Sequence, residues 1–309
     1  MLPHRQGVQL IQERTKGGLL GGDAVAALWK IGHHRYRRRP ARRLCLSLIF
    51  QAERGMSERS TVKSRLKGKR RSARRDAKIA AETNGGASRP DQVGYATALG
   101  YSEEELKAVP ADAVVSRGCG TPVALARLRR GEIVLDLGSG AGLDAFLAAR
   151  LVGPTGRVIG VDSILEMVNK ANDTAAKSKL ANVEFKHALI ERLPLDDCSV
   201  DVAISNCVMN HCADKVRAFK EVCRVLKVGG RMWISDLVAS GPFSEATLAD
   251  KVWGEWLAVA QSKSEYLQAI EQAGFHGINV EGEATFNMAE DDERLKGRII
   301  SISLSAWKK

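Results

Sequence analysis

Strand-like and helix-like segments alternate along the chain from about residue 132 onward, and this alternation restricts the fold more than any other feature of the sequence. Apolar runs suited to strands lie at 132–138, 157–162, 182–188, 199–205, 231–237 and 297–307. Amphipathic helical patterns lie at 143–152, 163–177, 214–227 and 264–275. Parallel strands need long crossover connections, which helices usually supply. The pattern therefore predicts an α/β fold with a doubly wound, mostly parallel sheet.

Basic residues are concentrated at the start of the chain. Residues 1–90 carry 22 Lys and Arg against 6 Asp and Glu, which leaves 25 against 30 for the rest. Like charges repel, and residues 1–90 lack sustained apolar periodicity, so we expect a disordered basic extension. Residues 91–309 form the expected folded domain, in which Ser102 and Glu105 have the spacing of a helix capping box.

The role of the basic extension is open to four interpretations. It could bind nucleic acid through phosphates, serve as an Arg-rich transit peptide, or remain a solvated tail. Alternatively, Met56 is the true start and the residues before it are an upstream extension. We do not expect the acidic remainder to bind nucleic acid, because such a ligand is usually met by a basic groove.

Cysteine usage and hydropathy indicate a cytoplasmic protein. The six cysteines include no CxxC pair, so neither a zinc ribbon nor a dense disulfide scaffold is expected. The apolar run 44–50 is flanked by arginines and is far shorter than the roughly 20 residues of a membrane span. We therefore expect neither a membrane anchor nor a secretory signal.

The segment VLDLGSGAGLD places a glycine-rich turn between an expected strand and an expected helix. Glycines allow close approach of a ligand to the backbone, and the following helix presents free N–H groups. The spacing is GxGxG, not the GxGxxG of dinucleotide sites, and Asp136 precedes Gly138 by two residues. A carboxylate there repels a pyrophosphate but attracts a cation. S-adenosylmethionine fits, because it carries an ammonium and a sulfonium but no phosphate.

Asp162 ends the second expected strand, 24 positions after Gly138. A carboxylate at this place can accept hydrogen bonds from both hydroxyls of a ribose. The alternative is that Asp162 only caps the helix that begins near Ser163.

The strings DLGSGAGLD, GVD and LKVGGRMWISD resemble the class I S-adenosylmethionine-dependent methyltransferases. The resemblance implies their Rossmann-like methyltransferase fold with a seven-stranded sheet. It also implies that Asn206 faces the methyl-transfer centre and that Asp162 holds the ribose. The other cofactor-binding residues it implies are Gly138, Ser139, Gly140 and Gly142 around the methionine part, and Ile190 and Glu191 beside the adenine, in addition to Asp136.

Four further segments, GYSEEELKAVP, RGCGTP, ISNCVMN and VWGEW, resemble the arsenite methyltransferases over residues 99–275. The resemblance implies that Cys119 and Cys207, with Asn206, are the catalytic residues and that an external thiol acts as reductant. Trivalent arsenic is a soft centre for which thiolates are natural ligands. Held by two or three thiolates, it would direct its lone pair at the sulfonium methyl group, so that the enzyme contributes mainly positioning.

The sequence departs from this family in its cysteines, and the family's further N-terminal cysteine pair has no counterpart here. Trp256 stands where the family has its third cysteine. Our hypothesis is that Cys212 partly replaces it, giving an arsenic site of Cys119, Cys207 and Cys212; the alternative is that Cys212 is a buried small residue. Two other functions stay open: a methyltransferase for another small organic acceptor, with Trp253 and Trp256 as an apolar or cation–π wall, or a nucleic-acid-associated methyltransferase that uses the basic extension.

Overall fold

The computed structural model describes residues 90–115, 117–178, 180–212, 214–241, 243, 247, 260–286 and 293–309. The basic extension up to residue 89 and the segment VWGEW (252–256), with Trp253 and Trp256, lie outside these residues. What the sequence predicts for them therefore stays a prediction.

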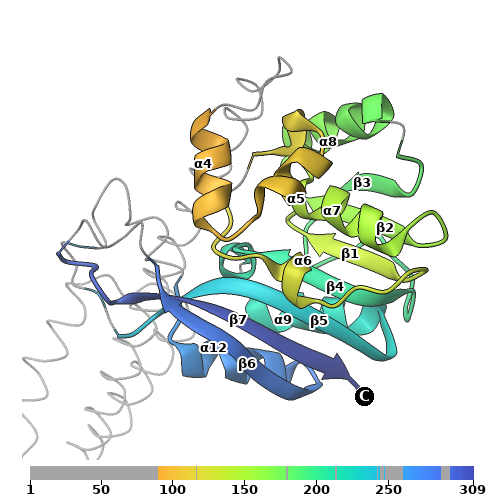
Figure 1. The fold of residues 1–309 in the computed structure, drawn as a ribbon. Helices are drawn as coiled ribbons and strands as arrows, with labels where there is room; N and C mark the ends of the chain where they lie inside the picture. Colours follow the sequence, from red (N-terminus) through yellow and green to blue (C-terminus); the bar gives the residue numbers. More distant parts are fainter. Residues whose placement is uncertain are drawn as a thin grey trace, which may run out of the picture. The chain divides into compact units, whose positions relative to one another are not determined.

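Seven strands form one mixed sheet in the order β3-β2-β1-β4-β5-β7-β6 (Figure 1). The first five are parallel, and β7 runs antiparallel to β5 and β6. Their bounds are β1 Ile133–Leu137, β2 Arg157–Asp162, β3 Val183–His187, β4 Val200–Asn206, β5 Leu226–Ala239, β6 Phe275–Thr285 and β7 Ile299–Lys308. The predicted doubly wound, mostly parallel sheet is confirmed.

Helices cover both faces of the sheet, as Figure 1 shows for α7 on one side and α9 and α12 on the other. The helices are α4 Pro90–Ala98, α5 Glu103–Ala108, α6 Pro122–Leu125, α7 Leu143–Val152, α8 Leu165–Ser178, α9 Lys215–Val225 and α12 Lys263–Gln272, with 3-10 turns η1 Ala111–Ala113 and η2 Met209–His211. Successive side chains of a strand point to opposite faces. Accordingly Val134 packs in the cluster with Phe146 of α7, and Leu135 in the cluster with Phe219 of α9.

Most of the expected elements form with small changes in their ends. The capping box is present, because the Ser102 hydroxyl accepts from Glu105 N and the Glu105 carboxylate accepts from Ser102 N. The expected helix 214–227 was too long: α9 ends at Val225, and Leu226 already pairs with Val200 in the sheet. The glycines at 229 and 230 lie inside β5 and do not end a helix.

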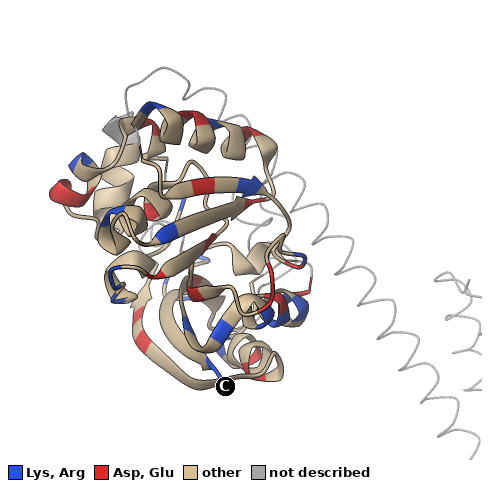
Figure 2. Cartoon of the chain, turned by 90° about the vertical axis from the view of Figure 1, so that its right-hand side faces the viewer, with Lys and Arg blue, Asp and Glu red and all other residues tan. Residues whose placement is uncertain are grey.

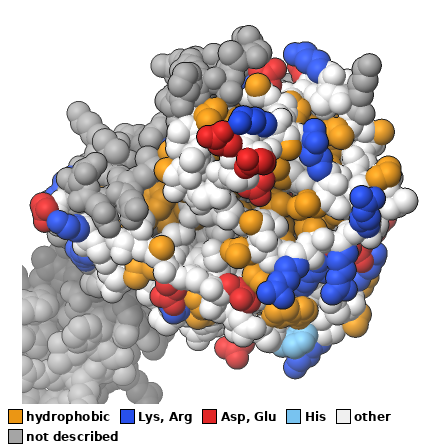
Figure 3. All heavy atoms as spheres, viewed as in Figure 1, with side chains coloured by type: hydrophobic (Ala, Val, Ile, Leu, Met, Phe, Trp, Pro, Cys, Tyr) orange, Lys and Arg blue, Asp and Glu red, His pale blue; other side chains and the backbone are white. Residues whose placement is uncertain are grey.

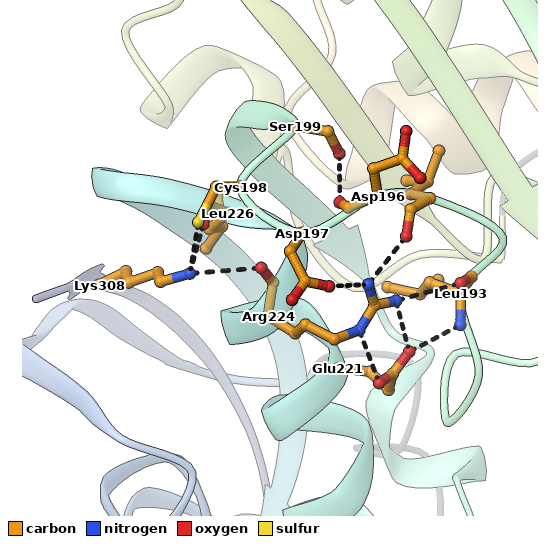
Figure 4. A network of polar contacts seen from close by, with 10 residues as sticks. Leu193, Asp196, Asp197, Cys198, Ser199, Glu221, Arg224, Leu226 and Lys308 are labelled. Carbon is orange, nitrogen blue, oxygen red and sulfur yellow. Dashed lines mark hydrogen bonds and ion pairs between the residues drawn. The ribbon is translucent and has the colours of Figure 1, made fainter.

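The edge of the sheet at which β4 begins is held by a polar network around Arg224 (Figure 4). Its guanidinium donates to Glu221 on the same helix and to Asp197 in the turn before β4. Lys308 lies on the other side of this turn, where its ammonium donates to Leu226 O at 2.7 Å and to Cys198 Sγ at 3.3 Å. Cys198 is thus a turn residue at the edge opposite to the strand ends that form the candidate site.

The surface of the described part is mixed in charge. In Figure 2, Lys and Arg alternate with Asp and Glu over the helices and strand ends. On the face seen in Figure 3, hydrophobic side chains reach the surface in small areas among polar and charged ones. None of the helices that the structure describes is both long and apolar enough to cross a bilayer.

Candidate active site

The glycine-rich turn connects β1 to α7 with a backbone that favours glycine. Gly138, Gly140 and Gly142 all have positive φ, between +52° and +99°. Gly140 N donates to Asp162 Oδ2 at 3.0 Å, which ties the turn to the end of β2. A Cβ at Gly140 would meet no atom within 4 Å, so the turn is open toward a ligand at this point.

A hollow beside this turn brings together several residues that the sequence assigns to the cofactor. Gly138, Asp162, Ile190 and Glu191 all line it. Asp162 also caps the start of the next helix, because its Oδ1 accepts from Ile164 N at 2.9 Å. The two interpretations of Asp162 are therefore compatible, since each carboxylate oxygen can accept more than one hydrogen bond.

Two buried oxygen atoms in the glycine-rich turn and the strand before it have no hydrogen-bond partner among the described residues. They are Asp136 Oδ2 and Ser139 Oγ. Burial raises the pKa of Asp136 well above its usual range, and the nearby carboxylates of Asp144 and Asp162 raise it further. A buried acceptor without a donor is costly, and a cationic donor would relieve it. The ammonium of S-adenosylmethionine is such a donor, and its sulfonium adds positive charge, so the residues present fit this ligand.

The loop that carries Cys119 is held against the carboxyl ends of β4 and β5 and the amino end of the antiparallel β7. Cys119 N donates to Asn206 Oδ1 at 2.9 Å, and Cys119 O accepts from Ser301 Oγ at 2.7 Å. The loop residue before it is bound as well, because Tyr95 Oη donates to Gly118 O at 2.8 Å. A Cβ on Gly118 would lie 2.4 Å from the Asn206 side chain. The glycine thus permits the approach that brings Cys119 into the site.

Asn206, the last residue of β4, links the cysteine loop to the start of α7. Its amide nitrogen lies 2.8 Å from Gly120 O, 3.0 Å from Tyr101 Oη and 3.2 Å from Asp144 Oδ2. Tyr101 Oη in turn donates to Asp144 Oδ1 at 2.8 Å. Burial raises the pKa of Asp144 to about 6, although both hydrogen bonds oppose the shift.

The sulfurs of Cys119 and Cys207 and a carboxylate oxygen of Asp236 all lie within 4.8 Å of one another. Cys119 is buried and Cys207 half-buried, and both contact an apolar cluster that includes Leu237 and Ile299. Burial raises the pKa of the Cys119 thiol, and its contact with Cys207 and the charge of Asp236 raise it further. Cys207 itself has a φ of +61°, a strained conformation for a residue with a side chain. The predicted thiol pair is thus brought together.

Asp236 is a site residue that the sequence analysis missed, as are Tyr95, Tyr101 and Asp144. Asp236 follows Ser235, which pairs with Asn206 across the parallel strands β4 and β5. The carboxyl ends of neighbouring parallel strands meet at one edge of a sheet, so the shared register was a signal that could have pointed to it.

Cys212 is buried at the end of the turn η2, just before α9. It is not part of the cluster of Cys119, Cys207 and Asp236. Instead it lines the hollow beside the glycine-rich turn together with Gly138 and Asp162. The hypothesis that Cys212 replaces the missing third ligand stays a prediction.

Comparison with known proteins is in agreement with this geometry. A family model for the methyltransferase domain matches residues 128–274. The chain is 44% identical to the arsenite methyltransferase of Halobacterium salinarum over 183 residues, which are 59% of this chain and 47% of that protein. It is 38% identical to the arsenite methyltransferase of Mus musculus over 187 residues, which are 57% and 49% of the two chains. The chain thus spans about half the length of these relatives.

Solved structures give the same result. The arsenic(III) S-adenosylmethionine methyltransferase of Chlamydomonas reinhardtii superposes with a TM-score of 0.56 at 32% identity, covering 71% of this chain and 74% of that one. A phosphoethanolamine N-methyltransferase of Haemonchus contortus, at 21% identity and a TM-score of 0.53, shares the fold. The chain belongs to the class I S-adenosylmethionine-dependent methyltransferases. Within that class, its sequence is similar to the arsenite methyltransferases.

Proposed function

We propose that this protein transfers a methyl group from S-adenosylmethionine to trivalent arsenic held by Cys119 and Cys207. The observation that carries the proposal is the pair of cysteine sulfurs, which lie within 4.8 Å of each other at the edge of the sheet beside the glycine-rich turn. Thiolates are the natural ligands of soft, thiophilic centres such as trivalent arsenic. The similarity to arsenite methyltransferases supports the same acceptor.

The proposed cofactor site combines the glycine-rich turn with the hollow beside it. When bound, S-adenosylmethionine supplies a methyl group on a positively charged sulfonium. Asp136 and Ser139 offer it their buried, unpaired oxygens, and Asp162 accepts from its ribose. In this proposal the remaining contacts come from Gly138, Gly140 and Gly142 around the methionine part, Ile190 and Glu191 beside the adenine, and Asn206 toward the methyl group.

On the acceptor side, the chain holds the substrate and keeps water away. Two hydroxides of arsenous acid leave as water with the thiol protons of Cys119 and Cys207, and two arsenic–sulfur bonds form. Asn206 fixes the backbone of Cys119 through the 2.9 Å hydrogen bond, so that the first sulfur stays in place. The apolar cluster around Leu237 and Ile299 limits hydration of the bound arsenic. We propose that an external thiol reductant regenerates the free thiols in a reducing cytoplasm.

Trp256 affects the proposal at one point, the third ligand of arsenic. Trp256 takes the place of the third cysteine of the family. If Cys212 supplies a third thiolate, Cys212→Ser should weaken arsenite binding. Unchanged affinity would contradict that assignment. Trp256→Cys should in turn tighten arsenite binding if the missing cysteine at this position would otherwise be a ligand of arsenic.

The direct test is incubation of the full chain with S-adenosylmethionine, arsenite and a reducing thiol, followed by separation of methylated arsenicals. We expect product from the wild type and none from Cys207→Ser. Cys198→Ser is the matched control, because Cys198 lies in the turn beside Lys308 and away from the thiol pair. If the wild type binds S-adenosylmethionine but yields no methylated arsenical, arsenite is not the acceptor. The alternative, a small organic acceptor, would then take precedence.

The basic extension enters the proposal only as a separate binding element. Deletion of residues 1–90 should leave methyl transfer to arsenite intact. If the extension binds nucleic acid, the same deletion should abolish the retention of the protein by nucleic acid at low salt, because phosphate contacts are screened as salt rises.

A further inference from the structure

Asp236 is a buried carboxylate next to the thiol pair, and the proposed function gives it no task. Its side chain is completely inaccessible to solvent. The described cation that acts on it is Lys215, a buried lysine whose positive charge favours the ionised form of Asp236. One of the Asp236 oxygens lies within 4.8 Å of both cysteine sulfurs. A completely buried carboxylate is costly even with a cation nearby and calls for an explanation.

Burial raises the pKa of Asp236, and the hydrogen bonds around its carboxylate oppose that shift and favour the ionised form. Oδ1 accepts from Asn210 Nδ2 at 2.8 Å and from Leu237 N at 2.8 Å. Oδ2 accepts from Tyr266 Oη at 2.9 Å and from Asn210 N at 3.3 Å. The Asn210 amide and the two backbone N–H groups can only donate here, and the Tyr266 hydroxyl is within donating distance of Oδ2. Three N–H groups that can only donate stabilise a carboxylate more than a protonated carboxyl, so these contacts favour the ionised form.

The same four hydrogen bonds argue against Asp236 as a ligand of arsenic. A carboxylate has about four lone-pair positions, and four donors occupy them. What Asp236 has left to offer the thiol pair is its negative charge. Inside an apolar environment such a charge acts far more strongly than it does in water. Its effect on the site is to favour whatever bears positive charge beside the two sulfurs.

Positive charge develops at this place during the proposed reaction. The arsenic lone pair forms a bond to the methyl carbon, the carbon–sulfur bond of the sulfonium breaks, and its electron pair stays on sulfur. Arsenic passes from the trivalent to the pentavalent state and gains one positive charge, while the former sulfonium becomes a neutral thioether. Methyl transfer therefore moves one positive charge from the sulfonium sulfur to the arsenic bound at the thiol pair.

We propose, on the basis of the proposed function, that Asp236 is the fixed counter-charge that stabilises arsenic as it becomes positive during methyl transfer. Charges that are held in place before the reaction cost no reorganisation when it occurs. The four hydrogen-bond donors supply this fixation. The role predicts an effect on the rate of methyl transfer with little effect on the binding of neutral arsenicals.

The test compares Asp236→Asn with wild type in two measurements. The first is the affinity for arsenite and for phenylarsine oxide, which forms bonds to two thiols and has its third valence filled by phenyl. The second is the single-turnover rate of methyl transfer with arsenite and S-adenosylmethionine saturating. We expect both affinities to stay within about twofold of wild type and the rate to fall about a hundredfold, as for loss of one charge-stabilising group.

Tyr266→Phe is the matched control. It removes one hydrogen bond to Asp236 but keeps the carboxylate, so its rate should stay within about tenfold of wild type. If Asp236→Asn does not fold, Asp236→Glu replaces it. Glutamate keeps the charge, so a rate within about tenfold of wild type supports the role, and a hundredfold loss with arsenical binding intact contradicts it.

Three other results would overturn the proposal. An unchanged rate in Asp236→Asn contradicts it directly. A loss of arsenite binding with phenylarsine oxide binding intact makes Asp236 a ligand, and an equal loss of both with a lower melting temperature makes it structural. Failure of the proposed function is distinct from these: the wild type would then bind the arsenicals and the cofactor but yield no methylated product, and the role of Asp236 would fall with it.

Discussion

The backbone N–H of Cys119 donates to the side-chain oxygen of Asn206 at 2.9 Å, across 87 positions of the sequence. This hydrogen bond joins the loop that carries the first thiol to the strand that ends next to the second, Cys207. The distance between the two thiols therefore depends on the Asn206 side chain. Because Asn206 also binds Gly120 O, it holds the loop at two points.

Asn206→Ala should weaken the binding of phenylarsine oxide about tenfold, which corresponds to loss of one or two hydrogen bonds that position a ligand. Phenylarsine oxide is the suitable probe because it reports on the thiol pair alone. Isothermal titration would measure its affinity. Asn172→Ala is the matched control, since Asn172 makes a comparable pair of hydrogen bonds to the backbone of Phe185 away from the cysteines. Equal affinities for the two variants would contradict the positioning role.

Gly118→Ala should disturb the contact between the loop that carries Cys119 and the Asn206 side chain by a change in the loop. Its Cβ would lie 2.4 Å from Asn206 Nδ2, so the loop must move away from β4. We expect a loss of about 1–3 kcal/mol in the free energy of unfolding, as for overpacking of a close contact, together with weaker arsenical binding. Gly94→Ala is the control, because this exposed position in α4 has open space around it and alanine favours a helix. Denaturant unfolding of both variants checks the difference.

Much of the fold was predictable because apolar runs and glycines mark its central elements. The expected strand 157–162 and helix 143–152 coincide with β2 and α7. The edge strand β6, Phe275–Thr285, was missed, because most of its side chains are exposed and its sequence lacks an apolar pattern. Its existence depends on pairing with β7, which is a tertiary effect.

The candidate site was predictable where residues lie close to a sequence motif. Gly138 and Asp162 follow from strand ends, and Cys119 and Cys207 follow from a resemblance to a thiol-using family. Asp236 was missed because it lies inside β5, three residues before the strand ends, and only the register of β5 against β4 brings it to the thiols. Register between strands is set by packing of the whole sheet, which local sequence does not specify.

Asp136→Asn should lower the affinity for S-adenosylmethionine and raise the stability of the fold. The buried Oδ2 of Asp136 has no donor among the described residues, and burial together with the charges of Asp144 and Asp162 raises the pKa of Asp136 and so disfavours its ionised form. Neutralisation should therefore raise the melting temperature, as is common when a strained functional group is removed. It should lower the affinity for S-adenosylmethionine about ten- to a hundredfold if the carboxylate binds its ammonium.

A second ligand separates the two effects of Asp136→Asn. Methylthioadenosine has the same nucleoside but lacks the ammonium and carboxylate of the amino acid part. Its affinity should be the same for wild type and variant. A parallel loss for both ligands would indicate a distorted pocket and would contradict a contact between Asp136 and the ammonium.

Asp144→Asn should change the way in which stability depends on pH. Burial raises the pKa of Asp144 to about 6 in the folded protein, above its ordinary value of 3.8. Between these two values the folded state binds a proton that the unfolded state has lost, so the free energy of unfolding falls as the pH rises through this window. A shift of about two pKa units corresponds to roughly 3 kcal/mol. The variant lacks this titration, so its stability relative to wild type should improve by about that amount between pH 4 and pH 7.

Chemical denaturation at several pH values between 4 and 7 measures this difference. The pH-dependent part is the useful quantity, because asparagine also alters the hydrogen bonds to Tyr101 and Asn206 by an amount that does not depend on the titration of Asp144. Glu104→Gln, which removes an exposed carboxylate from α5, is the control for the loss of one negative charge. A stability difference between Asp144→Asn and wild type that stays constant from pH 4 to pH 7 would show that Asp144 does not carry the raised pKa, and the link between Asn206 and α7 would then involve an ordinary, ionised aspartate.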